Sequence, residues 1–149
     1  MKIMFICTGN ICRSAMAHKL MQKKLKDNEV KDIDVYSCGI FAENGDASTY
    51  NAIEVTKEYG VDLKSHKATN IRDSKIDEMD LILCATMSHK YSVIQMYPSL
   101  ANKIYTLKEY VDENKDLDIK DPWGYDIEIY RFCIAEIDRL LDKLIEKIK

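Results

Sequence analysis

Short strand-like runs alternate with helical patterns along most of this chain, and that alternation restricts the folds it can adopt. The strand-like runs are rich in Ile, Val, Leu and Tyr. They are KIMFIC at 2–7, DIDVYSC at 32–38, DLILCAT at 80–86 and KIYTL at 103–107. The alternation predicts an α/β fold, in which a parallel sheet carries helices on both faces. In such sheets the working site lies at the carboxyl ends of the strands.

Helices are expected at residues 14–26, 48–59 and 88–97, and again at the C-terminus. The C-terminal pattern is the clearest of them. Its apolar residues recur at alternating spacings of three and four, which places them on one helix face. These residues are Ile127, Tyr130, Ile134, Ile137, Leu141, Leu144 and Ile148.

Composition restricts the class of protein. The 149 residues, 46% hydrophobic and 32% charged, predict a single soluble globular domain over 1–149. The net charge of −3 gives no general affinity for nucleic acid or for an anionic membrane. No apolar run approaches the roughly 20 residues that span a bilayer, and no export signal is evident. We therefore expect the five cysteines to be reduced thiols in the cytoplasm.

The stretch CTGNICRS follows the first predicted strand and runs from Cys7 to Ser14. It contains a cysteine followed six positions later by an arginine, a spacing that is weak evidence alone. The chain holds the same spacing a second time, at Cys133 and Arg139. That second pair lies inside the predicted C-terminal helix, where the backbone N–H groups already bond to carbonyls four residues back. We therefore assign Cys133 to packing.

The first pair lies between a strand and a helix, where the chain can bend around an anion. Gly9 and Asn10 are residue types that tolerate positive φ, and such a bend turns successive N–H groups inward. The following helix adds its positive end, and Arg13 adds a planar fork for two oxygens. This cradle suits a tetrahedral dianion. Cys7 would sit beneath it as a thiolate, with Ser14 able to donate to the sulfur.

A thiolate that attacks a phosphoryl group needs a proton donor for the departing atom. DPWG, from Asp121 to Gly124, is the best candidate. Its proline stiffens the loop, and Trp123 can supply an aromatic wall. On local sequence alone, an ordinary Asp-Pro turn with no catalytic role explains DPWG equally well. Asp116, Asp118 and Asp126 are rivals for the acid role.

CTGNICRS near the N-terminus, with a late DP, resembles the low-molecular-weight protein tyrosine phosphatase family. The resemblance covers the whole chain and includes SCGI at 37–40 and SHKA at 65–68. It implies a four-stranded parallel sheet flanked by helices. It also implies that Cys7 is the nucleophile, Arg13 the phosphate clamp and Asp121 the general acid. A polar network that holds the loop's shape would comprise Asn10, Ser14, Ser37 and His66.

The implied reaction has two steps through a phosphocysteine and uses neither metal nor cofactor. Its substrates would be phosphorylated proteins, and its product inorganic phosphate. The residues expected to line the phosphate and substrate site are Thr8, Gly9, Asn10, Ile11, Cys12, Ser14 and Trp123. In the family, Cys12 can also form a disulfide with the nucleophile, which implies thiol reductants as further partners.

The residues that bear on substrate choice point to different substrates. TLKEYV and DPWG look closer to the bacterial protein-arginine phosphatase branch, and Trp123 is followed by Gly124 rather than by a second aromatic residue. The tryptophan common in the neighbouring loop is missing, and Phe41 can replace it. That branch usually has threonine where this chain has Ile11, and isoleucine favours an aryl ring. We predict a phosphotyrosine phosphatase, with protein-arginine phosphatase as the alternative.

Two other classes of protein share parts of this pattern. Arsenate reductases share the fold and the loop, but they need two further cysteines close together, and only Cys84 lies in that region. A phosphate-binding module without catalysis would keep the cradle. It would have no need of Cys7 or Asp121.

Overall fold

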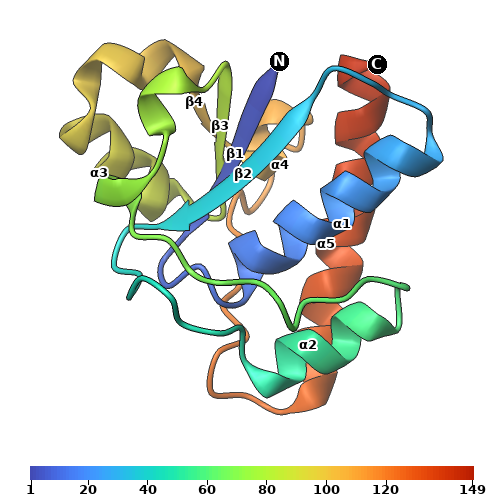
Figure 1. The fold of residues 1–149 in the computed structure, drawn as a ribbon. Coiled ribbons are helices and arrows are strands. Elements are labelled where there is room, and N and C mark those ends of the chain that lie inside the picture. Colours follow the sequence, from blue (N-terminus) through green and yellow to red (C-terminus); the bar gives the residue numbers. More distant parts are fainter.

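The computed structural model describes all residues, 1–149, and contains one four-stranded parallel sheet. Its strands are β1 (Lys2–Cys7), β2 (Asp34–Gly39), β3 (Leu81–Cys84) and β4 (Ile104–Thr106). Their order across the sheet is β2-β1-β3-β4, and every neighbouring pair is parallel (Figure 1). The predicted α/β fold and all four predicted strands are confirmed.

Five α-helices connect and cover the strands. They are α1 (Arg13–Asp27), α2 (Tyr50–Lys57), α3 (Met87–Met96), α4 (Leu107–Tyr110) and α5 (Ile127–Ile148). Three short 3-10 helices lie at Ile71–Asp73, Ile76–Glu78 and Pro98–Lys103. Among the α-helices, only α4 was not predicted from the sequence. It begins with a capping box, in which Thr106 and Glu109 exchange side-chain and backbone hydrogen bonds.

The two faces of the sheet bury separate apolar clusters, because alternate residues of a strand point to opposite faces. From β1, Ile3 and Phe5 join the larger cluster, which contains the buried faces of α1 and α5. Met4 and Ile6 join the smaller cluster, on the side of α3 (Figure 1). Helices therefore cover both faces, as predicted.

The C-terminal helix buries the face that the sequence indicated. Tyr130, Ile134, Ile137, Leu141 and Leu144 are all buried, and α5 packs on α1 and α2. Each fully buried side chain of this size contributes about 1.5–3 kcal/mol to folding. Ile127 and Ile148, at the two ends of this helix, are only half-buried. None of the helices is long and apolar enough to cross a membrane.

Candidate active site

The segment between β1 and α1, residues 8–12, forms a tight loop at the carboxyl end of the sheet. Cys7 is the last residue of β1, where the sequence placed it. Asn10 has a φ of 56°, in the left-handed region. Gly9, the other residue that could tolerate a positive φ, does not adopt one, and a Cβ there would meet only the Ile11 side chain. The loop therefore takes its left-handed bend at Asn10 alone.

The glycine that this loop does require lies on the neighbouring strand. A Cβ on Gly39, the last residue of β2, would come within 2.5 Å of the Thr8 carbonyl oxygen. The backbone of β2 can thus pass directly beneath the loop only because residue 39 has no side chain. Gly39 lies in SCGI, a motif of the family resemblance, and nothing in the local sequence indicates this role.

The loop presents donors that the protein itself does not use. The backbone N–H groups of residues 9–12 have no acceptor in the protein. They lie beside the N-terminus of α1, which carries the positive end of the helix dipole. Arg13, the first residue of α1, is only 5% exposed and places its cation at the same spot. This arrangement is suited to hold an anion.

Cys7 faces this concentration of donors. Its Sγ lies 2.9 Å from Ser14 Oγ and accepts from the Ser14 backbone N–H at 3.4 Å. The predicted contact between the Ser14 hydroxyl and the sulfur is therefore present. Both residues are buried, so these hydrogen bonds act with little competition from water.

The Asn10 side chain fixes the shape of the loop. Its amide Nδ2 donates to Ser14 Oγ at 2.8 Å and to Ser37 Oγ at 3.0 Å. Its Oδ1 accepts from the Thr69 backbone N–H at 3.0 Å. Because the amide fills one acceptor position on each serine, both hydroxyl protons remain for other partners. For Ser14 the nearer partner is the Cys7 sulfur at 2.9 Å, and the Cys38 carbonyl lies at 3.5 Å.

Two histidines complete this network, and both are held neutral by burial. His66 Nε2–H donates to the Asn10 carbonyl at 2.8 Å, and burial lowers its pKa. His18, absent from the sequence prediction, places Nδ1 2.7 Å from Ser37 Oγ. Burial, with a smaller contribution from Lys19, lowers the pKa of His18 to about 3. The structure thus brings together Asn10, Ser14, Ser37 and His66 as predicted, and adds His18.

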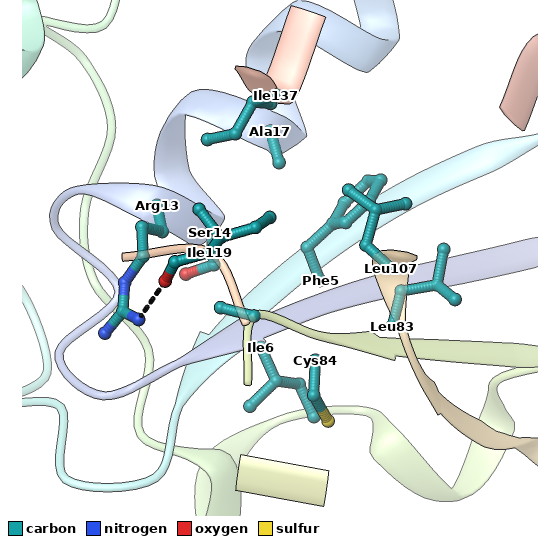
Figure 2. Close-up of a pocket in the computed structure, with 11 residues that line it drawn as sticks. Phe5, Ile6, Arg13, Ser14, Ala17, Leu83, Cys84, Leu107, Ile119 and Ile137 are labelled. Atoms are coloured by element: carbon teal, nitrogen blue, oxygen red, sulfur yellow. Dashed lines mark hydrogen bonds between the residues drawn. The ribbon is translucent and has the colours of Figure 1, made fainter. Parts of the chain in front are cut away.

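A second loop, between α4 and α5, brings an acid to the Arg13 guanidinium. Arg13 Nη1 donates to the Ile119 carbonyl at 2.9 Å (Figure 2). Arg13 Nη2 lies 3.5 Å from Asp121 Oδ2. Asp121 Oδ1 accepts from the Trp123 backbone N–H at 3.1 Å. The Asp121 side chain is 52% exposed, so it reaches both the buried arginine and the solvent.

The rival aspartates have other partners. Asp118 Oδ1 accepts from the Met87 backbone N–H at the start of α3, and Asp126 caps α5 through the Ile129 N–H. Asp116 has a positive φ and bonds weakly to the Asp118 N–H. Asp121 is the aspartate that lines the pocket described next. The geometry therefore favours Asp121 as the acid.

A buried lysine on α4 shapes the beginning of this loop. Lys108 Nζ donates to the carbonyls of Asp116 and Asp118, at 3.1 and 2.9 Å, and pairs with Glu136 of α5 at 2.9 Å. The TLKEYV segment therefore anchors the loop that carries Asp121. This anchoring role was not predicted from the sequence, where the segment carried only the family resemblance.

The loops together enclose an open pocket of about 220 Å³. Thr8, Ile11 and Trp123 form its sides, Cys7 and Arg13 lie within it, and its remaining lining residues are Gly9, Cys12 and Asp121. Trp123 is 63% exposed, which leaves the indole free to cover a substrate. Gly124, with a φ of 84°, allows the turn that follows it.

A second space behind Arg13 is not a binding site. It lies between β1, β3 and the helices α1 and α5 (Figure 2), and its lining is mostly apolar, including Phe5, Leu83 and Ile137. Its volume is about 10 Å³, roughly that of one water molecule. It belongs to the core that supports Arg13.

Cys12 contacts a pair of hydroxyl groups outside the pocket. Its Sγ lies 3.5 Å from Thr49 Oγ1 and 3.5 Å from Tyr130 Oη. Burial raises the pKa of the Cys12 thiol, so it stays protonated at neutral pH. Tyr130 lies on the apolar face of α5, which is why sequence reasoning assigned it to the core and did not foresee this contact.

The other three cysteines are buried free thiols. Cys38 and Cys84 are fully buried, and burial raises the pKa of each. No set of three His, Cys, Asp or Glu side chains is grouped closely enough to hold a metal ion.

The chain is similar to known proteins in both sequence and structure. The family model described as "Low molecular weight phosphotyrosine protein phosphatase" matches residues 2–149. A protein-arginine-phosphatase from Geobacillus stearothermophilus is 36% identical, over 99% of this chain and 96% of the relative. A low molecular weight protein-tyrosine-phosphatase, PtpB of Staphylococcus epidermidis, is 32% identical, over 97% and 96%. The crystal structure of a low molecular weight protein tyrosine phosphatase from T. tengcongensis superposes with a TM-score of 0.92, at 41% identity and 99% coverage of both chains.

Proposed function

The chain belongs to the low molecular weight phosphotyrosine protein phosphatase family of cysteine phosphatases, and on that premise we propose that it hydrolyses phosphotyrosine in proteins. The proposed nucleophile is Cys7, the proposed phosphate clamp is Arg13, and the proposed general acid is Asp121. The observation that carries the assignment is their meeting in one pocket, beside a loop whose N–H groups are unpaired.

The first step forms a phosphocysteine. The Cys7 thiolate attacks phosphorus, the bond from phosphorus to the leaving group breaks, and Asp121 gives its proton to the departing atom. The loop N–H groups and Arg13 stabilise the charge on the equatorial oxygens. Ser14, whose hydroxyl lies 2.9 Å from the sulfur, stabilises the thiolate before attack and when it leaves again.

The second step releases inorganic phosphate. Asp121, now a carboxylate, takes a proton from a water molecule, which attacks phosphorus and displaces the Cys7 thiolate. The exposure of Asp121 allows water to reach it, and its 3.5 Å contact with Arg13 holds it over the pocket. Neither step calls for a metal ion.

The preference for phosphotyrosine rests on the sides of the pocket. Ile11 and Trp123 line it, and an aryl ring gains from packing against apolar and aromatic walls. A phosphorylated guanidinium carries N–H groups, and burying these against isoleucine leaves them without acceptors.

Protein-arginine phosphatase is the second candidate, favoured by the relatives. Two protein-arginine-phosphatases, from Geobacillus stearothermophilus and Bacillus subtilis, are 36% and 34% identical to this chain. Two segments also look closer to that branch. One is TLKEYV, whose Lys108 anchors the acid loop, the loop between α4 and α5 that carries Asp121, and the other is the turn at Gly124.

The deciding experiment compares the two substrates on the purified protein. We expect a higher kcat/KM for a phosphotyrosine peptide than for a phosphoarginine peptide of otherwise identical sequence. The reverse order would overturn the tyrosine assignment and favour the second candidate. If neither peptide nor a simple aryl phosphate released phosphate, the phosphatase proposal itself would be wrong.

The setting we propose is the cytoplasm, with phosphorylated proteins as partners. All five cysteines are free thiols, which suits a reducing compartment.

A further inference from the structure

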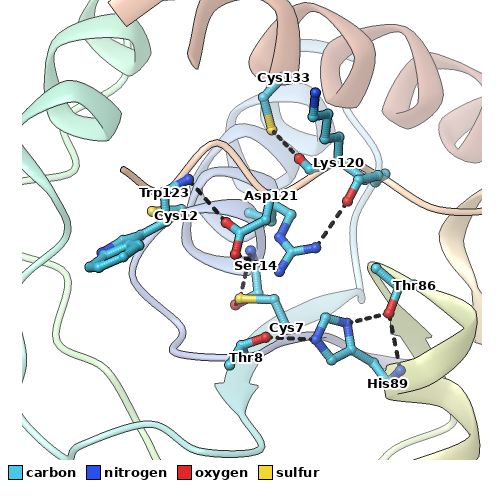
Figure 3. A network of polar contacts seen from close by, with 12 residues as sticks. Cys7, Thr8, Cys12, Ser14, Thr86, His89, Lys120, Asp121, Trp123 and Cys133 are labelled. Atoms are coloured by element: carbon cyan, nitrogen blue, oxygen red, sulfur yellow. Dashed lines mark hydrogen bonds and ion pairs between the residues drawn. The ribbon is translucent and has the colours of Figure 1, made fainter. Parts of the chain in front are cut away.

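His89 is a buried side chain that the proposed reaction does not use, yet it contacts the loop of residues 8–12 that is proposed to bind phosphate. It lies in the first turn of α3, on an element separate from the loop and from Asp121. Its Nε2 is 2.8 Å from Thr8 Oγ1, and its Nδ1 is 2.9 Å from Thr86 Oγ1 (Figure 3). Each ring nitrogen therefore faces one threonine hydroxyl.

The proton on each of these bonds can be assigned from the surrounding donors. Thr86 is the N-cap of α3, and its Oγ1 already accepts from the His89 backbone N–H at 3.1 Å. His89 Nδ1 is the only acceptor that the Thr86 hydroxyl has in the protein, so that hydroxyl proton is directed to Nδ1. A neutral imidazole carries one proton, so with Nδ1 accepting, Nε2–H donates to Thr8 Oγ1.

The ring is neutral at ordinary pH. Burial, followed by the nearby charge of Arg13, lowers the pKa of His89 to about 4. The groups whose charges act on the ring are Arg13 at the base of the loop and Asp118 and Asp121 on the acid loop. The neutral ring carries a single proton, which the contact with Thr86 leaves on Nε2, the nitrogen that faces Thr8.

Thr8 is left with a proton and no protein acceptor for it. The only side-chain partner of its Oγ1 is the His89 ring, which donates to it. Thr8 is exposed and lines the pocket beside Cys7 and Arg13. The strongest acceptor that enters this pocket in the proposed reaction is the doubly charged phosphoryl group.

We propose that Thr86 and His89 turn the Thr8 hydroxyl proton toward the bound phosphoryl group, which makes the Thr8 side chain a phosphate ligand in addition to the loop N–H groups. His89 is a positioning residue that acts through Thr8 and does not touch the substrate. This inference rests on the proposed function, because it requires phosphate to bind in the loop.

The test measures inhibition of aryl phosphate turnover by inorganic phosphate. A hydrogen bond to a charged acceptor contributes on the order of tenfold or more in affinity, so Thr8→Val should raise the phosphate inhibition constant by about that factor. Thr8→Ser keeps the hydroxyl and should stay close to wild type. An unchanged constant in Thr8→Val would overturn the proposal.

A double-mutant cycle tests the part played by His89. His89→Leu should weaken phosphate binding in the wild-type background and add nothing in the Thr8→Val background, because it acts only through that hydroxyl. His89→Gln, whose amide can donate to Thr8, should restore part of the affinity. Equal effects of His89→Leu in both backgrounds would reduce His89 to a packing residue and overturn its positioning role.

Two further readouts separate the possible failures. Melting temperatures identify any His89 variant that unfolds, and in that case the pair Thr8→Val and Thr8→Ser still decides whether the hydroxyl binds phosphate. A wild type that neither hydrolyses aryl phosphate nor binds inorganic phosphate would overturn the proposed function. Normal phosphate inhibition of the wild type, with no effect of Thr8→Val, would overturn this inference alone.

Discussion

The chain contains the same cysteine-to-arginine spacing twice, and the structure gives the two pairs opposite environments. Cys7 and Arg13 flank a loop whose N–H groups are unpaired, and Arg13 is buried beside Asp121. Cys133 and Arg139 lie within α5, where the backbone is internally bonded. Arg139 is about half exposed and pairs with Glu113 at 3.0 Å.

The two thiols differ as much as the two arginines. Cys7 Sγ has the Ser14 hydroxyl and backbone N–H as partners. Cys133 Sγ has only a 3.8 Å contact to the Lys120 carbonyl, and burial raises its pKa to about 12. The spacing alone therefore carries no chemistry. What distinguishes the first pair is a backbone that leaves its N–H donors free.

The largest expected difference is between the two cysteines. Cys7→Ser should abolish turnover, because a serine hydroxyl does not ionise appreciably in this site, while vanadate or phosphate binding should largely survive through the loop N–H groups and Arg13. Cys133→Ser should leave activity intact. A Cys7→Ser enzyme that kept a tenth of wild-type activity would show that the covalent mechanism is wrong.

Asp121 lines the pocket that holds Cys7 and Arg13, whereas Glu113, the acid that pairs with Arg139, does not, so the loss of Asp121 tests the first site alone. Asp121→Asn should lower the rate by about 10²–10⁴ for substrates with poor leaving groups, the usual range for a general acid. The loss should shrink for phosphate esters of acidic phenols, which leave without a proton. Equal losses across a leaving-group series would assign Asp121 a structural role.

The arginines allow a matched substitution that preserves charge. Arg13→Lys removes the fork that binds two oxygens and the bond to the Ile119 carbonyl, and we expect a loss of about 10²–10³ in kcat/KM, comparable to removing one transition-state donor. Arg139→Lys, at an exposed pair, should change neither kcat nor KM. Similar kinetics for the two variants would mean that Arg13 is not a phosphate ligand.

A smaller effect is expected at the mouth of the first site. Ile11→Thr adds a hydroxyl that can accept one guanidinium N–H, so the ratio of kcat/KM should move toward phosphoarginine by about 1–3 kcal/mol. Both substrates are to be measured on both proteins. If the ratio stayed constant, Ile11 would not be the cause of the preference.

The smallest effect concerns protection of the nucleophile. We expect mild peroxide to link Cys7 to Cys12 in a disulfide that a thiol reverses, with Cys133 unmodified. Peptide mapping by mass spectrometry identifies the linked pair. In Cys12→Ser, thiol treatment should restore less activity, and complete recovery in that variant would contradict a protective role.

Features that depend on a local pattern of residues could be predicted from the sequence. The four strands, the apolar face of α5, and the placement of Cys7 and Arg13 around a bent loop follow from periodicity and from residue type. Local sequence alone could not separate Asp121 from Asp116, Asp118 and Asp126, although the family resemblance singled it out. The structure separates them, because it places Asp118 and Asp126 at helix N-termini and Asp121 in the pocket.

The residues that sequence reasoning missed act across long separations in the chain. His89 meets Thr8 across 81 positions, and Tyr130 meets Cys12 across 118. Gly39 is required by the close approach of the Thr8 carbonyl, a contact between two segments that no local pattern contains. Lys108 entered the sequence interpretation only as part of TLKEYV, but it is buried and satisfies two carbonyls of the loop that carries Asp121.

The most direct test of the account is to find which residue carries the phosphoryl group during turnover. Wild-type protein turning over an aryl phosphate is quenched rapidly in acid, digested and mapped by mass spectrometry. We predict one phosphoryl group on Cys7 and none on Cys133, with no modified species in Cys7→Ala. Phosphate attached to any other residue, or undiminished turnover by Cys7→Ala, would contradict the assignment of Cys7 as the nucleophile.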